Sequence, residues 1–308
     1  MYKPKDIIEL IANNVRKTRN PFGAANSTIN NWWNGTLMHR EGDAMLFTGL
    51  MYQLVPYIEK TTRYLERYED SYLANYVRFG KYMPKFLVRL TFRFLASTED
   101  RNKFNGILKS IVEILLKSKV DFCYRPELDY YSGILLYDLG DIDGFTSHAR
   151  FVANTLKENG IKKLITVDPH TTYALKVLYP KYSGETFEVK TYFELLNLRG
   201  ENGTKQVTLH DPCFYGRYLE LSDVPVKVLE NLGIECVAVR NSGQFTNCCG
   251  GPAESISPKL STEVLSRRVE ELKATGAPIV AMCPICMGAL MKGGVEVEDL
   301  STLIARCA

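Results

Sequence analysis

The chain has 308 residues, of which 45% are hydrophobic and 24% charged, and its formal net charge is +3. This length allows two domains with cores of their own, and the composition is typical of a globular protein. So small a net charge gives no reason to expect a nucleic-acid partner. The sequence has no run of about 18 apolar residues, the length that a membrane-spanning helix needs.

The chain contains eight cysteines, and its first residues, 1–17, mix charged and apolar side chains as a signal peptide does not. We therefore expect a cytoplasmic, reducing environment, where cysteines serve metal binding or redox chemistry more often than disulfides. No G-x-G-x-x-G segment follows a predicted strand, so the sequence does not indicate a bound dinucleotide.

The first half begins with an arm and continues as strand, helix and strand. Short apolar runs bounded by Gly or Pro predict strands at 44–48 and 163–167. A helix is predicted over 144–159, and Gly160 ends it. Alternating strands and helices imply a parallel sheet covered on both faces.

A helical insertion lengthens this half at residues 60–120. Within it, residues 76–97 repeat a basic side chain every four positions after Pro84, among aromatic and aliphatic residues. Such a helix suits a membrane surface, a groove on a partner subunit, or the core with a solvated basic stripe, and the sequence leaves all three open. Residues 104–118 predict a second amphipathic helix, packed into the core.

The second half repeats this order. Strands are predicted at 206–210, 234–239 and 278–282, and a helix over 258–275 ends at Gly276. In a parallel sheet, functional sites form at the carboxyl ends of the strands, where the loops meet. A site in this half is therefore expected just beyond the strands.

The two halves align as a faded repeat, with these equivalent pairs: Gly133 and Gly250, Gly160 and Gly276, Pro169 and Pro284, Leu175 and Leu290. We therefore predict an α/β fold of two pseudo-symmetric Rossmann-like domains with parallel sheets, plus the insertion in the first. The predicted divisions are an arm at 1–42, a first domain at 43–185 and a second at 186–308.

Five cysteines of the second half form one pattern: Cys213, the pair Cys248-Cys249, and Cys283-Pro-Ile-Cys286. Thiolates at such spacing usually hold a metal centre. A four-coordinate zinc ion needs only four of them, so five indicate something larger than one ion. The remaining cysteines lie outside the pattern and are expected to be core or uninvolved: Cys123, Cys236 and Cys307.

The segments HDPCFYGR, NCCGGP and CPICMGAL resemble the cysteine-rich CCG domain. This domain occurs, usually as a tandem pair, in heterodisulfide reductase and in iron–sulfur subunits of glycolate, lactate and glycerol-3-phosphate oxidising complexes. The resemblance covers most of the chain from about residue 43. It implies one non-cubane [4Fe-4S]-type cluster with these ligands: Cys213, Cys248, Cys249, Cys283 and Cys286. It also implies that Gly250 and Gly251 let the backbone approach the sulfides.

The first half departs from this family because it has lost the equivalent cysteines. The residues in their places are Leu50, Tyr131, Ser132, Asp168 and Thr171. No second cluster is expected there, so cleavage of a disulfide between two facing clusters is not expected either. Asp168, His170 and His148 offer an alternative ion site, although a histidine on a turn more often hydrogen bonds within its loop.

His210 lies three residues before Cys213 and offers two interpretations. Its ring can hydrogen bond to a cluster sulfur and tune the potential, or the backbone can satisfy it at the strand end. The sequence does not decide between them.

The favoured function is an electron-transfer iron–sulfur subunit of an oxidoreductase complex, heterodisulfide reductase-like or linked to a flavin dehydrogenase. Its expected partners are flavoprotein and ferredoxin-type iron–sulfur subunits on other chains. One alternative is a zinc-binding structural or membrane-anchor subunit, and another is a thiol/disulfide reductase that acts at a single cluster. Residues 76–97 leave open a peripheral attachment to the inner face of the membrane.

Overall fold

The first of two parallel sheets has three strands in the order β1-β2-β3. The computed structural model describes residues 4–36, 38–67, 95–200, 205–254 and 257–308. The strands of this sheet are β1 (Ala44–Phe47), β2 (Lys163–Thr166) and β3 (Glu188–Thr191). Beyond β1, Cys123 adds an isolated parallel bridge to Met45.

The second sheet has four parallel strands in the order β5-β4-β6-β7. Their bounds are β4 (Lys205–His210), β5 (Ile234–Cys236), β6 (Ile279–Ala281) and β7 (Val297–Asp299). The strand β5 lies beside β4 as Cys123 lies beside β1, so the two sheets share one layout. This confirms the α/β fold with two Rossmann-like parallel sheets.

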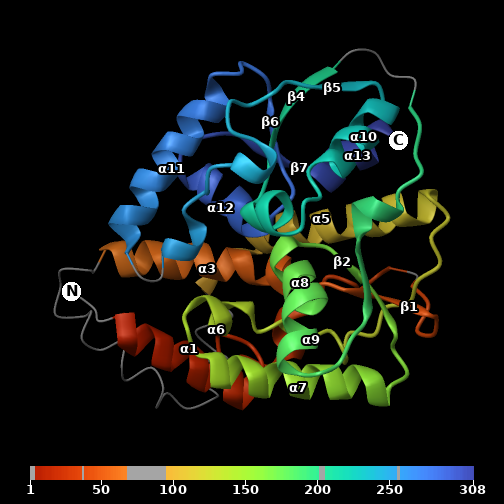
Figure 1. Cartoon of the computed structure of the whole chain (residues 1–308), viewed down its shortest axis with the longest axis vertical. Helices are drawn as coiled ribbons and strands as arrows, with labels where there is room; N and C mark the ends of the chain where they lie inside the picture. The colour runs from red at the N-terminus through yellow and green to blue at the C-terminus, as the bar shows by residue number, and fades with distance from the viewer. Residues whose placement is uncertain (1–3, 37, 68–94, 201–204, 255–256) are drawn as a thin grey trace.

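Helices cover both sheets, and α3 and α5 run across the middle of the molecule, where α12 packs on α3 and α13 on α5 (Figure 1). The α-helices of the first half are α1 (Pro4–Thr18), α2 (Asn26–Ile29), α3 (Met51–Arg67), α5 (Thr98–Lys117), α6 (Ile134–Asp138), α7 (Ile142–Glu158), α8 (Pro169–Tyr173) and α9 (Tyr179–Tyr182). Those of the second half are α10 (Asp223–Asn231), α11 (Pro258–Lys273), α12 (Pro284–Lys292) and α13 (Leu300–Cys307). Shorter turns are η2 (Ala174–Leu178), η3 (Tyr192–Leu195), η4 (Phe214–Tyr218), η5 (Gly243–Phe245) and η6 (Gly251–Ala253).

The strand β1 is buried on both faces, as parallel strands between helices are. Leu46 packs into a core cluster that reaches the second sheet, and Met45 and Phe47 pack into a separate cluster of the first half. The helix α5 joins the shared cluster through these side chains: Phe104, Ile107, Leu108, Ile111, Val112, Ile114 and Leu115. The predicted core-packed helix at 104–118 is therefore confirmed, and it connects the halves.

The strands and helices expected from the sequence are present with small shifts at their ends. The strand predicted at 234–239 is shorter, because regular pairing with β4 ends at Cys236 and one further bond, from the Val237 N–H to the Val207 carbonyl at 2.8 Å, closes it. The strand β3 was not predicted. It pairs with β2, so the division proposed after residue 185 precedes the last strand of the first sheet. Most of the segment 76–97 lies outside the described residues.

Candidate metal centre

The five cysteines of the pattern come from three loops at the carboxyl edge of the second sheet. Cys213 follows β4 and begins the π-helical turn η4, and Cys283 follows β6 and caps α12. The pair Cys248-Cys249 lies between β5 and α11. Loops after neighbouring parallel strands meet at one edge, so side chains far apart in sequence come together.

Hydrogen-bonding contacts link the five thiols in a row, from Cys213 to Cys248, Cys249, Cys286 and Cys283. All five are free cysteines. Three are buried and the first two are half-buried. A buried row of free thiols is a set of soft ligands suited to a cation, because only a metal or protons can offset thiolate charges there.

The pKa values of the thiols are lowered at two positions of this row and raised at the other three. The pKa of Cys248 is lowered, because the thiols of Cys213 and Cys249 and the Gly250 N–H donate to its sulfur. The pKa of Cys283 is also lowered: burial alone would raise it, but contacts with Cys286 and His170 outweigh burial. The neighbouring donor thiols have raised pKa values. The surroundings of Cys248 and Cys283 therefore favour the thiolate form at these two positions even without a bound metal.

The set is wider than a cage for one ion. Within the described ranges, the group whose ligand atoms all lie within 4.8 Å of one another is His210, Cys249 and Cys286. Four thiolates around zinc would lie about 4 Å apart, given Zn–S bonds of about 2.3 Å. No four of the five sulfurs form so compact a group in the described part of the chain. The five sulfurs together therefore extend beyond the compact group of His210, Cys249 and Cys286, which by itself has the size of a site for one ion.

Two glycines bring the backbone close to the sulfurs. Gly250 has φ +81°, and its N–H donates to the Cys248 Sγ at 3.3 Å. A Cβ at Gly250 would lie 2.5 Å from the carbonyl oxygen of Ser261, and one at Gly251 would lie 2.5 Å from Ile285 Cγ2. A side chain at either position would push the Cys248-Cys249 loop away from its neighbours.

His210 is fully buried beside these cysteines, and a side chain satisfies its Nδ1. Arg268 Nε donates to Nδ1 over 2.9 Å, whereas Nε2 has no partner among the described residues. Burial, followed by the Arg268 charge, lowers the pKa of His210 to about 3. The ring is therefore neutral, and the interpretation in which backbone satisfies it is wrong.

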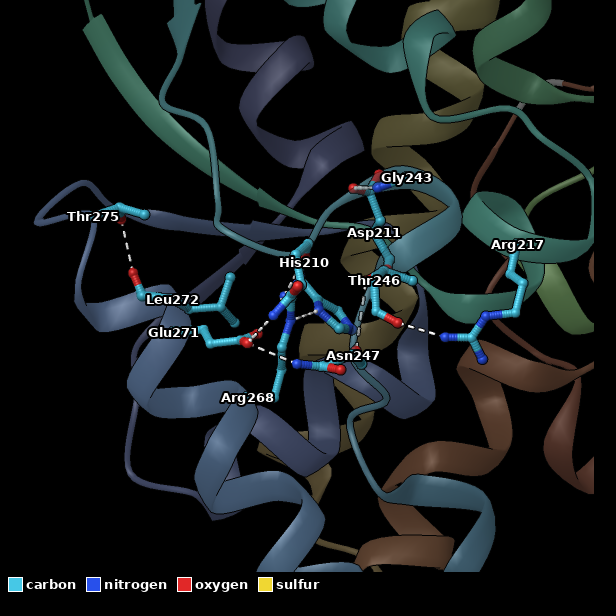
Figure 2. A network of polar contacts seen from close by, with 11 residues as sticks. His210, Asp211, Arg217, Gly243, Thr246, Asn247, Arg268, Glu271, Leu272 and Thr275 are labelled. Atoms are coloured by element: carbon cyan, nitrogen blue, oxygen red, sulfur yellow. Dashed lines mark hydrogen bonds and ion pairs between the residues drawn. The ribbon is translucent and has the colours of Figure 1, made fainter.

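The loop that precedes Cys248 is held by hydrogen bonds with Asp211 and with Arg217 (Figure 2). Asp211 accepts from the Gly243 N–H at 2.9 Å, and its carbonyl accepts from the Thr246 hydroxyl at 2.8 Å. Arg217 Nη2 donates to the Thr246 carbonyl at 2.6 Å. These contacts fix residues 243–247 just before Cys248.

The degenerate site of the first half keeps the backbone of the intact one without its thiols. Gly133 has φ +86°, as Gly250 has +81°. The Asp168 carboxylate accepts from the Thr171 N–H at 2.9 Å, as the Cys283 sulfur accepts from the Cys286 N–H at 3.5 Å. The repeat is thus preserved in conformation.

The other replacement residues are buried, and they pack in the core or form hydrogen bonds within the first half. Leu50 is in the first-half core, and the Tyr131 hydroxyl accepts from the Leu135 N–H at 2.7 Å. The Ser132 carbonyl accepts from the Tyr179 hydroxyl at 3.0 Å. Among the described residues, this site brings no thiol into the place of the lost ligands.

The alternative prediction, an ion site formed by Asp168, His170 and His148, is wrong. These side chains form no group of close ligand atoms in the part of the chain that the structure describes. His148 Nε2 lies 2.6 Å from the Tyr131 carbonyl, whereas His170 Nδ1 lies 3.8 Å from Cys283 Sγ and 3.7 Å from an Asp168 oxygen. The degenerate half thus presents His170 to the intact site.

Sequence reasoning missed both His170 and Arg268 as neighbours of the cysteines. The repeat itself could have found His170, which answers to Ile285 between the two cysteines of Cys-Pro-Ile-Cys. Arg268 had a weaker signal, an Arg and a Glu three residues apart on the helix that precedes β6. Beside the site lies a cavity of about 110 Å³ between the halves. Its wall is mostly apolar but also includes His170, Asp138 and Glu254.

No helix among the described residues is long and apolar enough to cross a bilayer. Residues 207–291 match the family model of the CCG cysteine-rich domain, a range that contains all five cysteines and both glycines.

Curated relatives resemble a larger part of the chain. It is 32% identical over 215 residues to one of the subunits of dihydromethanophenazine:CoB–CoM heterodisulfide reductase from Methanosarcina mazei, covering 62% of this chain and 53% of that protein. It is 30% identical over 223 residues to a probable membrane-anchored ferredoxin of Chromohalobacter salexigens, covering 64% and 33%. It is 28% identical over 223 residues to the EtfAB:quinone oxidoreductase of Syntrophomonas wolfei, covering 66% and 31%. The matched region thus spans between about a third and a half of each relative.

Proposed function

We propose that this chain, which carries a cysteine-rich domain of the CCG family, is an iron–sulfur electron-transfer subunit of a multi-subunit oxidoreductase complex. The carrying observation is the row of five free thiols, three buried and two half-buried, at the carboxyl edge of the second sheet. The names of the relatives support the same class, since they denote a heterodisulfide reductase component, a ferredoxin and a quinone oxidoreductase.

The cofactor in this proposal is one non-cubane [4Fe-4S]-type cluster, held by these ligands: Cys213, Cys248, Cys249, Cys283 and Cys286. When bound, such a cluster supplies a centre that takes up and releases one electron. The chain contributes the rest: thiolates that bind iron, the Gly250 N–H that donates toward sulfur, and burial that keeps water away. The described residues of the degenerate site place no thiol where the lost ligands would be, so one cluster is proposed and not two.

The proposed partners are proteins that carry the other redox cofactors of such a complex. The described residues include no ferredoxin-type cysteine run or dinucleotide motif. We infer that a flavoprotein and ferredoxin-type clusters on other polypeptides or segments deliver the electrons. The segment 76–97 is the proposed contact with a membrane surface or partner subunit.

A second candidate is a thiol/disulfide reductase that acts at the single cluster. The cavity of about 110 Å³ favours it, because its wall includes His170, which also contacts the Cys283 sulfur. A small sulfur compound bound there would lie beside the cluster ligands. The zinc-bound anchor has less support, since no four of the five sulfurs form a compact group among the described residues.

The proposal is tested by anaerobic reconstitution with iron and sulfide, followed by dithionite reduction and EPR. A visible absorption band that bleaches on reduction and returns on oxidation is the expected result. Absence of any reversible spectral change would overturn it. In the same cuvette, thiol added to the oxidised protein separates the two candidates, because only the reductase predicts a thiol-dependent change in the EPR spectrum.

A further inference from the structure

A buried arginine contacts the histidine beside the cysteine row. Arg268 and His210 are both 0% exposed. Arg268 rises from α11, and its guanidinium meets the imidazole at the end of β4 (Figure 2). The contact is a hydrogen bond from Nε to Nδ1 of 2.9 Å.

The direction of this bond decides where the imidazole proton lies. Guanidinium nitrogens always donate and never accept, so Nδ1 of His210 must present a lone pair to Arg268. A neutral imidazole then carries its single proton on Nε2. This Nε2 is buried without a partner among the described residues, and a ring nitrogen of His210 lies within 4.8 Å of the sulfurs of Cys249 and Cys286.

We propose that Arg268 is a positioning residue that fixes His210 as an Nε2–H donor to the sulfurs of the bound cluster and prevents its use as a metal ligand. This inference rests on the proposed function. A metal-bound histidine normally donates its second ring N–H to a carbonyl or carboxylate. Here the second nitrogen accepts a bond, so coordination through Nε2 would need an imidazolate.

The arginine is itself held in place by groups that reach the cysteine loop. Its Nη1 donates to the Asn241 carbonyl at 2.8 Å and to Glu271 Oε2 at 3.0 Å. The other oxygen of Glu271 accepts from Asn247 Nδ2 at 2.7 Å, and Asn247 directly precedes Cys248. One carboxylate thus connects the guanidinium to the loop that carries two ligands.

The arrangement has an electronic consequence. An N–H that donates to cluster sulfur stabilises the more negative, reduced state and raises the reduction potential. The buried guanidinium charge acts in the same direction at short range, because little water screens it. Loss of either group should therefore make the cluster harder to reduce.

The tautomer is tested by ¹⁵N-histidine NMR on the full chain, before and after reconstitution. The expected spectrum has a protonated Nε2 and a bare Nδ1 for His210 in both states. Arg268→Met should release the lock and give a mixture of tautomers, whereas Arg267→Met, an exposed neighbour on the same helix, should leave the spectrum unchanged. A proton on Nδ1 in the wild type, or no effect of Arg268→Met, overturns the proposal.

The bond to sulfur is tested by midpoint potential and pulsed EPR on reconstituted protein. His210→Leu and Arg268→Met should lower the potential, while His210→Gln, whose amide can place an N–H near the former Nε2, should restore part of the loss. Unchanged potential in His210→Leu, or a strongly coupled nitrogen ligand in the wild type, overturns the proposal. Zinc bound in place of iron would overturn the proposed function, while the NMR result would still decide the role of Arg268.

Discussion

Asp168 and Cys283 occupy the same place in two copies of one motif. Their φ angles are −140° and −141°, each precedes a proline, and each side chain accepts from the backbone N–H three residues later. In the first half, Asp168 keeps the helix-capping role but offers a carboxylate in place of the thiol. A carboxylate replaced a sulfur without changing the backbone, which separates the structural part of the motif from its metal-binding part.

This pair predicts opposite outcomes for the same substitution. Asp168→Ala should lower the free energy of unfolding by about 1 kcal/mol or more, because a buried helix cap is lost, and leave iron content unchanged. Cys283→Ala should lose most of the iron. Urea unfolding and iron analysis on both variants check this. Equal iron loss in the two variants would contradict the division.

The ligand set predicts a sharp contrast among the eight cysteines. Each Cys→Ser change in the row should reduce bound iron and sulfide after reconstitution, because serine is a poor ligand for soft metals. The changes are at Cys213, Cys248, Cys249, Cys283 and Cys286. The controls are Cys123→Ser, Cys236→Ser and Cys307→Ser, which should retain both. Iron loss in a control with its fold intact, judged by circular dichroism, would show that the set is wrongly drawn.

Gly250 directly precedes the turn η6, and we expect any side chain at this position to disturb the site. Gly250→Ala should lower iron binding and stability, since the added Cβ would meet the Ser261 carbonyl at 2.5 Å in a positive-φ conformation. Gly276→Ala is the matched control, because Gly276 has φ +71° with nothing within 4 Å of an added Cβ. It should cost only the backbone strain, about 1 kcal/mol. Similar losses in both would remove the packing argument.

His148 predicts a pH dependence in the first half, away from the cysteines. Burial, followed by the Arg19 charge, lowers its pKa to about 4 from 6.5. The unfolded chain therefore binds a proton that the folded chain resists, so this stabilisation is complete above pH 6.5 and is lost as pH falls toward 4. The full effect is at most about 3 kcal/mol.

The variant His148→Gln isolates this contribution. Gln keeps a donor for the Tyr131 carbonyl but does not titrate, so unfolding free energies of the variant should fall less between pH 6.5 and 4 than those of the wild type. His39→Gln, at an exposed position, is the control. Parallel pH profiles for the wild type and His148→Gln would contradict the role of burial.

The sequence was sufficient to predict those elements that have clear local signals and that recur in the same order in both halves. Short apolar runs predicted the strands, Gly160 and Gly276 predicted the ends of two helices between them, and the cysteine spacing predicted which side chains meet. It was insufficient for β3, whose alternating pattern Glu-Val-Lys-Thr is short and half-exposed. The contacts of His170 with Cys283 and of Arg268 with His210 depend on how elements far apart in the chain pack, and no local propensity encodes that.

Metal and sulfide content of the anaerobically purified and reconstituted chain tests the central claim most directly. The account predicts iron and acid-labile sulfide in comparable amounts, lost together in Cys249→Ser, with zinc well below one per chain. One zinc per chain, with neither iron nor sulfide retained after reconstitution, would contradict it.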